Sequence, residues 1–484
     1  MSCNPFRFEH TYAGLPAGFH SVVQPTPVHS PRLLLLNEAL AAELGIHTAD
    51  CGESDWANML SGNAMPPGSQ PLAQAYAGHQ FGHFTMLGDG RALLLGEHRT
   101  PTGQLFDIQL KGSGPTPYAR RGDGRAALGP MLREYIISEA MHALGIPTSR
   151  SLVVVATGEP VMREQVLPGA VLTRVMDSHL RVGHFEYASH FLGTNDLETL
   201  VHYALQRHYP QVAPEESPAL TLLQEVAKRQ TELVVEWMRV GFIHGVMNTD
   251  NMSMAGLTFD YGPCAFMNAY HPGTVFSSID RQGRYAFAMQ PGIVQWNLVC
   301  LANALIPLIH ENVDHAVILA RQVIDAYPDR FADAWLSMMR RKLGLTGEQP
   351  GDKALADELL HWMQQHRADY THTFLQLMDV MPEGVLQLTP SFVAWKEKYN
   401  KRQQEQEGGR EAGLALMRNA NPVYIPRNHR VEAALEAAQV HADLKPVQQL
   451  LEVLRSPYAM QSGRDEFLHG PEGGDAGYQT FCGT

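Results

Sequence analysis

Two carboxylates and a carboxamide lie close together near the middle of the chain. Asp250 and Asn251 are adjacent at the end of the segment that starts at His244, and Asp260 follows shortly after them. Phosphoryl-type chemistry on a nucleotide requires such a set, because one carboxylate positions a nucleophile while an Asn and an Asp hold a divalent metal on the phosphates. These residues therefore predict metal-assisted chemistry at a nucleotide.

The tripeptide Asp260-Tyr261-Gly262 is a variant of the Asp-Phe-Gly of protein kinases, whose aspartate holds metal. Three-residue matches arise by chance in a chain of 484 residues, so this one has little weight alone. It gains weight from two features upstream, a glycine-rich turn and a strand that carries a lysine.

The glycine-rich turn spans residues 88–91 (Gly-Asp-Gly-Arg) and precedes an apolar strand at residues 92–95. A hairpin turn is the commoner role for such a sequence, and a phosphate cradle is the alternative. A second strand, at residues 106–111, alternates apolar and polar side chains, which places Lys111 on the polar face of a half-buried strand.

A helix is predicted over residues 130–144, because proline suits its first turn and Gly145 ends it. In kinase-like folds a strand lysine pairs with a helix glutamate to hold phosphates. Glu134 is the preferred partner of Lys111, and Glu139 is the competing candidate.

The order strand, strand, helix, strand, strand predicts an α+β chain with a protein-kinase-like, two-lobed fold, in which a strand-rich small lobe precedes a helical large lobe. The later strands are predicted at residues 152–156 and 170–175. Further helices are predicted at residues 33–44, 222–240, 298–308 and 431–454.

Four regions follow from this pattern. We expect an N-terminal extension at residues 1–80 and a small lobe with the nucleotide-binding residues at 81–190. A helical large lobe with the catalytic and metal residues is expected at 191–400, followed by a C-terminal helical extension and mobile tail at 401–484.

Composition narrows the functional class. A net charge of −13 disfavours a nucleic-acid partner, since phosphate backbones are held by excess Lys and Arg. The N-terminus lacks a secretory pattern, and no apolar run reaches the eighteen or so residues of a membrane span, so we expect a cytoplasmic protein with no membrane partner.

The cysteines are scattered and include no Cys-x-x-Cys pair. This spacing predicts a reducing compartment, and neither a structural zinc site nor a disulfide framework.

Although the net charge of the chain is negative, the region between residues 91 and 181 is rich in Arg and Lys, which suggests a focused anion site. Its members are Arg91, Lys111, Arg120, Arg121, Arg125, Arg133, Arg163, Arg174 and Arg181.

Three other nucleotide or metal motifs are excluded. The glycines of residues 122–127 imitate a dinucleotide fingerprint but follow no convincing strand, and no Gly-Lys-Ser/Thr exists for a Walker loop. His79 and His83 have helical metal-site spacing, but they lack a nearby third ligand and are flanked by glycines that oppose a helix. We therefore expect these two histidines to serve packing.

The ordered set of motifs closely resembles the SelO family (selenoprotein O, called YdiU in bacteria) over nearly the full chain. The motifs are residues 88–91, 109–115, 120–125, 172–174, 244–251, 260–263 and 422–428. The resemblance implies a protein nucleotidyltransferase with a protein-kinase-like fold, which binds ATP turned around so that the α-phosphate faces the acceptor. AMP would then pass to Ser, Thr or Tyr of a target protein with release of pyrophosphate; some bacterial members use UTP and transfer UMP.

The resemblance also implies roles for single residues. Asp250 matches the proton acceptor, Glu134 the partner of the lysine, and Asn251 and Asp260 the ligands of Mg²⁺ or Mn²⁺. The nucleotide-binding residues implied are Gly88, Gly90, Arg91, Lys111, Asp123, Gly124, Arg174, Arg181 and Asp260.

Two alternatives remain at this stage. A conventional kinase would transfer the γ-phosphoryl group, but its catalytic loop separates Asp from Asn by four residues, whereas Asp250 and Asn251 are adjacent. A catalytically idle nucleotide-binding scaffold is the second. Near the C-terminus, Cys482 stands where many eukaryotic members have Cys-x-x-selenocysteine, so it lacks a local redox partner and is either an inert thiol or one that pairs with an internal cysteine.

Overall fold

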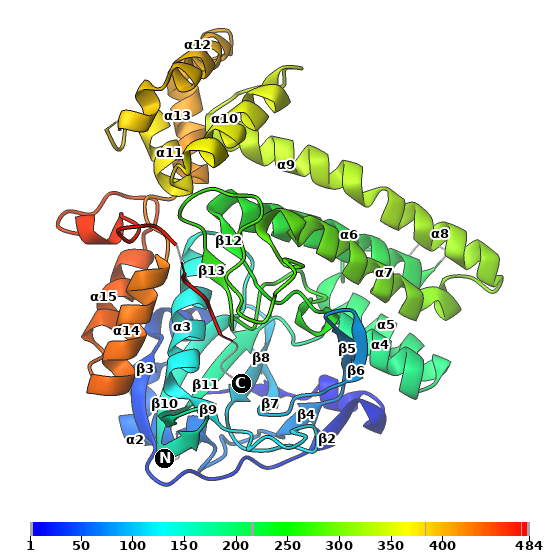
Figure 1. The fold of residues 1–484 in the computed structure, drawn as a ribbon. Coiled ribbons are helices and arrows are strands. Elements are labelled where there is room, and N and C mark those ends of the chain that lie inside the picture. The colour runs from blue at the N-terminus through cyan, green and yellow to red at the C-terminus, as the bar shows by residue number, and fades with distance from the viewer. Residues whose placement is uncertain (1–2, 214–216, 383, 476, 482–484) are drawn as a thin grey trace.

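The computed structural model describes residues 3–213, 217–382, 384–475 and 477–481, and it combines one large sheet with many helices (Figure 1). The sheet is built from the first part of the chain and lies at the bottom of Figure 1. The helices beyond it lie above and to the sides. The α+β class expected from the sequence is compatible with this arrangement.

The large sheet has nine strands, all paired antiparallel where they meet. Its main path runs β2 (His20–Val22), β4 (Leu72–Gln74), β7 (Ala92–Arg99), β8 (Leu105–Lys111), β11 (Val166–Met176), β10 (Arg150–Met162) and β3 (Arg32–Leu36). Two short strands, β1 (Phe8–Glu9) and β9 (Ala126–Ala127), pair with β7 and β11.

Helices cover both faces of this sheet. Along β10, Val153 and Val155 pack into the cluster that contains α1 (Glu38–Leu44) and α2 (Glu53–Ser61), whereas Val154 packs into the cluster of α3 (Leu128–Ala143). The expectation that β8 is half-buried is wrong, because the polar side chains on its second face are also covered. Lys111 is only 7% exposed, and its ammonium group pairs with Glu134 and Asp260.

Two predicted helices differ from the structure. Residues 33–36 belong to β3, because this leucine run pairs with β10, and the helix α1 starts only after Asn37, whose side chain accepts a hydrogen bond from the Leu40 amide. The long helix expected at 431–454 is two helices, α14 (Asn428–His441) and α15 (Lys445–Leu454). The break falls at Ala442, which has a positive φ of 52°.

The predicted helix at 222–240 is confirmed as α6 (Pro218–Val240), and Gly241 ends it in the left-handed conformation. It packs beside α7 (Gln290–Ile309) and α9 (Tyr327–Leu343). The other helices of this part are α4 (Val182–Phe191), α5 (Thr194–His208), α8 (Val313–Asp325), α10 (Asp352–His366), α11 (Tyr370–Leu377), α12 (Pro390–Gln404) and α13 (Gly409–Ala420).

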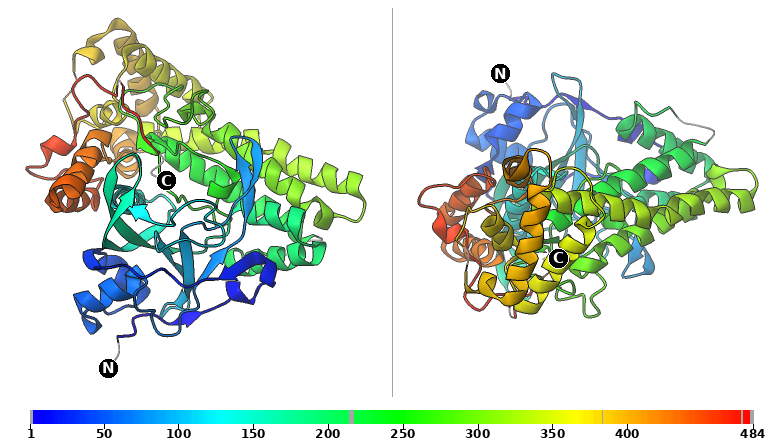
Figure 2. Two further views of the ribbon diagram at one scale, coloured as in Figure 1. Left: turned by 60° about the horizontal axis from the view of Figure 1, so that its bottom comes forward. Right: turned by 90° about the horizontal axis from the view of Figure 1, so that it is seen from above.

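The C-terminal helices return to the sheet. Helices α14 and α15 lie beside α3, the helix that carries Glu134, and the views in Figures 1 and 2 agree on this. Beyond them, residue Thr480 pairs with Ser277 and donates its hydroxyl to the Pro263 carbonyl at 2.7 Å. The end of the described chain therefore lies next to the segment that follows Asp260.

One helix in the described part of the chain, Phe287–Ile309, is long and apolar enough by composition to cross a membrane. Its apolar window is 56% buried inside the protein, where α7 packs against α4, α6 and α8. We assign it to the protein core on that ground.

The cysteines depart from expectation in one respect. Cys3 and Cys51 are joined as a disulfide with their Cα atoms 5.3 Å apart, so the expectation of no disulfide is wrong. The N-terminal segment and the start of α2 meet beside the sheet, although the two residues are 48 apart in sequence. Cys264 and Cys300 are buried thiols, and Cys482 lies outside the described residues.

Candidate active site

A cavity of about 310 Å³ lies between the glycine-rich turn, the end of β8 and the segment that carries Asp250 and Asp260. Most of the residues expected at the nucleotide and catalytic site line it: Gly88, Gly90, Arg91, Lys111, Asp123, Gly124, Arg174, Arg181, Asp250 and Asp260. The structure therefore brings together residues that are up to 172 positions apart in sequence, from Gly88 to Asp260.

Lys111 is the hub of an ion cluster at one end of this cavity. Its Nζ atom donates to Glu134 Oε2 at 2.7 Å and also to Asp260 Oδ1. Arg174 on β11 donates from Nε to Glu134 Oε1 at 2.7 Å and from Nη2 to Asp260 Oδ1 at 3.4 Å. Two carboxylates and two cations thus neutralise one another in a site where an isolated charge would be costly.

Glu134, not Glu139, is the partner of Lys111. Glu134 is 2% exposed, and although burial would raise its pKa, Arg174 and Lys111 hold that pKa below its usual value. Glu139 instead binds Arg150 and the side chain of Asn37. Helix α3 therefore directs Glu134 at Lys111 and Arg174, which line the cavity, and Glu139 at Arg150 and Asn37.

Asp260 is held in a backbone conformation that few non-glycine residues adopt, with φ of 65°. The amide of Gly262 donates to its carbonyl at 2.9 Å, which fixes a tight turn at the Asp-Tyr-Gly segment. Partial burial alone would raise the pKa of Asp260, but Lys111 and Arg174 outweigh it and hold the pKa far below its usual range. Asp260 is therefore ionised at neutral pH.

Asp250 has the opposite electrostatic environment. It is 8% exposed, and its Oδ1 atom has no hydrogen-bond partner within the described chain. Burial raises its pKa to about 6, against the opposing effect of Arg181. A carboxylate with a raised pKa and a free oxygen can accept a proton from a group placed beside it.

Arg181 connects the segment that carries Asp250 with the glycine-rich turn that carries Asp89. Its Nη1 donates to the backbone oxygen of Asp250 at 3.1 Å, and its Nη2 lies 3.7 Å from Asp89 Oδ1. Its guanidinium also lies over the rings of Tyr76 and Phe259, at 4.3 and 4.9 Å from their centroids. This side chain is therefore fixed before any ligand arrives.

Sequence reasoning missed Asp89 as a positioning residue. It is 4% exposed and accepts hydrogen bonds from the Gln74 amide at 3.2 Å and from Gln109 Nε2 at 3.4 Å. It thus ties the glycine-rich turn to β4, β8 and Arg181. The only sequence signal was its place between Gly88 and Gly90, which also fits an ordinary hairpin.

Glycine is required at position 88 because the loop that carries Tyr118 passes close to the glycine-rich turn. Its φ is 124°, and a Cβ atom there would lie 2.4 Å from the Tyr118 ring. That loop leads to Asp123, which accepts hydrogen bonds from Arg163 Nη1 and the Arg125 amide, each at 2.9 Å. This glycine-containing loop therefore closes one side of the cavity, which Gly122, Asp123, Gly124 and Arg125 line.

Asn251 does not line this cavity but an adjoining hollow of about 1010 Å³, which shares Gln80, Arg163, Asp250 and Asp260 with it. Asn251 Nδ2 donates to the Val246 carbonyl at 3.1 Å, so the amide oxygen is the atom that can bind a ligand. Phe81 and Ile279 line the same hollow. The two predicted metal ligands and the predicted base therefore face one shared space.

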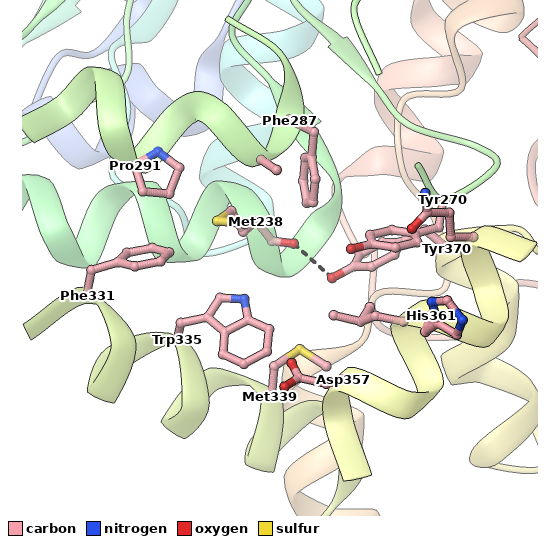
Figure 3. Close-up of a pocket in the computed structure, with 13 residues that line it drawn as sticks. Met238, Tyr270, Phe287, Pro291, Phe331, Trp335, Met339, Asp357, His361 and Tyr370 are labelled. Atoms are coloured by element: carbon pink, nitrogen blue, oxygen red, sulfur yellow. Dashed lines mark hydrogen bonds between the residues drawn. The ribbon is translucent and has the colours of Figure 1, made fainter. Parts of the chain in front are cut away.

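A third cavity, of about 360 Å³, lies among α6, α7, α9, α10 and α11 (Figure 3). Its wall is mostly aromatic and thioether, and Tyr370 closes one side by donating to the Met238 carbonyl at 2.9 Å. The described residues that line it include no Lys or Arg. This cavity does not suit a nucleotide phosphate.

Comparisons with known proteins agree with one another. The family model described as "Protein adenylyltransferase SelO" matches residues 4–455. The chain is 55% identical over 480 residues to the "Protein nucleotidyltransferase YdiU" of Nitrosococcus oceani, covering 99% of this chain and 97% of the relative. Proteins of the same name from Bacillus cytotoxicus and Alkaliphilus metalliredigens are 53% and 54% identical, with 99% of this chain and 98% of each relative covered.

Proposed function

The chain belongs to the SelO family of protein adenylyltransferases and is a protein nucleotidyltransferase, and from this premise we propose its finer chemistry. It transfers AMP from ATP to Ser, Thr or Tyr hydroxyls of target proteins and releases pyrophosphate; UMP from UTP is the variant of the same reaction. The observation that carries the proposal is the cavity in which Lys111, Arg174 and Arg181 face Asp250 and Asp260.

The proposal includes a protein-kinase-like fold. Its support is the pairing of a strand lysine with a helix glutamate, together with an Asp-Tyr-Gly aspartate in contact with the same lysine. The region limits 81–190 and 191–400 keep their proposed roles as small and large lobes. Within the proposed N-terminal extension, residues 1–80, strands β2, β3 and β4 pair into the same large sheet as the small lobe.

The residues present fit Mg²⁺ or Mn²⁺. Asp260 makes both of its ion contacts through Oδ1, which leaves Oδ2 for a cation, and Asn251 offers its amide oxygen to the same space. Oxygen ligands of this kind suit hard divalent ions, which take few protein ligands and complete their shell with phosphates and water. When bound, the ion would neutralise charge on the phosphates and on the leaving group.

Side chains of the protein bind the triphosphate and accept the proton of the acceptor hydroxyl. Lys111, Arg174 and Arg181 hold the triphosphate by charge, and they are fixed in advance by Glu134 and Asp89. Asp250 orients the acceptor hydroxyl and takes its proton. The hydroxyl oxygen forms a bond to the α-phosphorus while the bond from that phosphorus to the bridging oxygen breaks, and pyrophosphate leaves with the bonding electrons.

The test of the proposal is a product analysis. The protein is incubated with a mixture of cellular proteins, Mg²⁺ and either ATP or UTP, and released pyrophosphate is measured alongside the mass added to modified peptides. We expect pyrophosphate release with an AMP or UMP increment on Ser, Thr or Tyr. Release of nucleoside diphosphate with a phosphate increment would overturn the proposal in favour of a kinase.

A further inference from the structure

Three side chains with metal-binding atoms meet behind the segment that carries Asp250. They are His79 on β5 (Ala77–Gln80), Glu186 on α4 and Cys300 on α7, and their ligand atoms all lie within 4.8 Å of one another. Strand β5 forms a hairpin with β6 (His83–Met86), in which Gln80 pairs with His83. His79 and His83 therefore do not share a helix face, and the partners of His79 come from distant elements.

Two of these three side chains are buried, and the third is partly exposed, so an ion could enter from solvent. The Glu186 side chain is 2% exposed and Cys300 is 8% exposed, whereas the His79 side chain is 26% exposed and gives access from solvent. His79 Nδ1 contacts Glu186 Oε1. The Thr249 hydroxyl lies beside the same carboxylate, but within the described chain Glu186 Oε2 is buried and has no hydrogen-bond partner.

The unsatisfied oxygen is the second observation that points to a ligand. A buried carboxylate oxygen without a donor costs free energy unless something positive or a hydrogen-bond donor reaches it. A cation bound between Glu186, His79 and Cys300 would satisfy it. Imidazole nitrogen, carboxylate oxygen and thiolate sulfur are together the ligand types of Zn²⁺.

We propose that His79, Glu186 and Cys300 bind a thiophilic divalent cation of the Zn²⁺ type, with a water molecule in the fourth position. Zn²⁺ takes ligands at about 2.0–2.3 Å, so the three donor atoms close around it with small side-chain movements. Binding replaces the contact between His79 and Glu186 and releases the thiol proton of Cys300 to solvent.

The charges of the bound state balance. Burial, and then the neighbouring Glu186, raise the pKa of the Cys300 thiol to about 12, so the cation has to displace the thiol proton and binds more weakly as the pH falls. The carboxylate and the thiolate together neutralise a divalent ion. Arg284, whose guanidinium lies 4.7 Å from the centroid of the Trp296 ring, is the nearby positive group that opposes binding.

The site is separate from the one proposed for Mg²⁺, because it contains sulfur and nitrogen ligands that Mg²⁺ does not prefer. It is nevertheless coupled to the active site by a short path. The His79 amide donates to Thr249 Oγ1 at 2.7 Å, and Thr249 precedes Asp250. An ion here would fix β5, α4 and α7 together behind the proposed base.

The test uses Co²⁺ as a spectroscopic substitute for Zn²⁺. The full-length protein is stripped of metal with a chelator, kept without reductant so that Cys3 and Cys51 stay paired, and titrated with Co²⁺ in the absence of nucleotide. Thiolate-to-cobalt charge transfer gives a near-ultraviolet band that an all-oxygen site cannot give. The variants are Cys300→Ser and Glu186→Gln, with Cys264→Ser and Cys482→Ser as matched controls.

We expect the charge-transfer band in the wild type and both controls to saturate with one equivalent of Co²⁺ and to be displaced by Zn²⁺. The band should be lost in Cys300→Ser and the affinity weakened in Glu186→Gln, with circular dichroism showing that each variant is folded. Should Cys300→Ser fail to fold, the Glu186→Gln result decides. No band in the wild type at saturating Co²⁺, or an unchanged band in Cys300→Ser, would overturn the proposal, and neither outcome bears on nucleotidyl transfer.

Discussion

Lys111 Nζ donates to Glu134 Oε2 at 2.7 Å and, through the same ammonium, contacts Asp260. One side chain at the end of β8 therefore joins α3 to the Asp-Tyr-Gly segment. The ion contacts among Lys111, Glu134 and Asp260 fix these side chains before a nucleotide binds. They are therefore already placed where the phosphates and a metal ion would bind.

The first prediction concerns the two glutamates of α3. Glu134→Gln should lower kcat/KM for nucleotidyl transfer by about 10²–10³-fold, because Lys111 and Arg174 lose the charge that positions them. Glu139→Gln is the matched control, since Glu139 lies on the same helix but binds Arg150 and Asn37. Steady-state kinetics on both purified variants check this, and equal losses would contradict the assigned partner.

The second prediction ranks two residues of the cavity. Asp260→Ala should abolish activity more completely than Arg91→Ala, because it removes a metal ligand and leaves Lys111 without one of its two carboxylates. The measurement is single-turnover transfer at saturating ATP and Mg²⁺. Comparable residual rates in the two folded variants would refute the ranking.

The third prediction separates chemistry from binding at Asp250. Asp250→Asn should lower kcat by about 10²–10⁴-fold, as is usual when a general base is lost, while the KM for ATP changes little. Asp314→Ala, an exposed acidic residue at the start of α8, is the control. A large rise in the KM for ATP with unchanged kcat would instead assign Asp250 to nucleotide binding.

The fourth prediction concerns stability far from the active site. Asp352 at the start of α10 is buried and accepts hydrogen bonds from Arg402 at 2.7 Å and Arg340 at 2.8 Å. Arg402→Met should lower the free energy of unfolding by about 3 kcal/mol at pH 7, because it leaves part of the buried carboxylate unpaired. Urea unfolding of both proteins measures this.

The pH dependence of that difference has a definite sign. Burial would raise the pKa of Asp352, but hydrogen bonds from Arg402 and Arg340 hold it below its usual value, so its ionised form stabilises the fold above the unfolded pKa of about 3.9. This contribution is lost as the pH falls through the lowered folded-state pKa. The gap between wild type and Arg402→Met should therefore shrink below about pH 4, and a constant gap would contradict the assignment.

The sequence predicted the centre of the site because its signals are local. The alternation of residues 106–111 placed Lys111 on one strand face, and the helix that follows carried Glu134 at a fixed spacing. Asp250, Asn251 and Asp260 lie within one short segment. Positions of this kind can be predicted from sequence because the face on which a side chain lies follows from the periodicity of its own strand or helix.

Tertiary contacts decided what the sequence could not show. Asp89 acts through Gln109 and Arg181, which come from two other elements. The group of His79, Glu186 and Cys300 spans 221 positions and has no motif. The leucine run at residues 33–36 fits a helix or a buried strand by pattern alone, and only its pairing with β10 selects the strand.

The central claim is nucleotidyl transfer that depends on Asp250, and labelled ATP tests it most directly. The protein and Asp250→Ala are incubated with Mg²⁺ and ATP that carries label at the α- or the γ-phosphorus, and the label retained on denatured protein is counted. We predict that the wild type retains α-label and no γ-label, and that Asp250→Ala loses the α-label. Retained γ-label alone, or no retained label with any nucleotide or metal, would contradict the account.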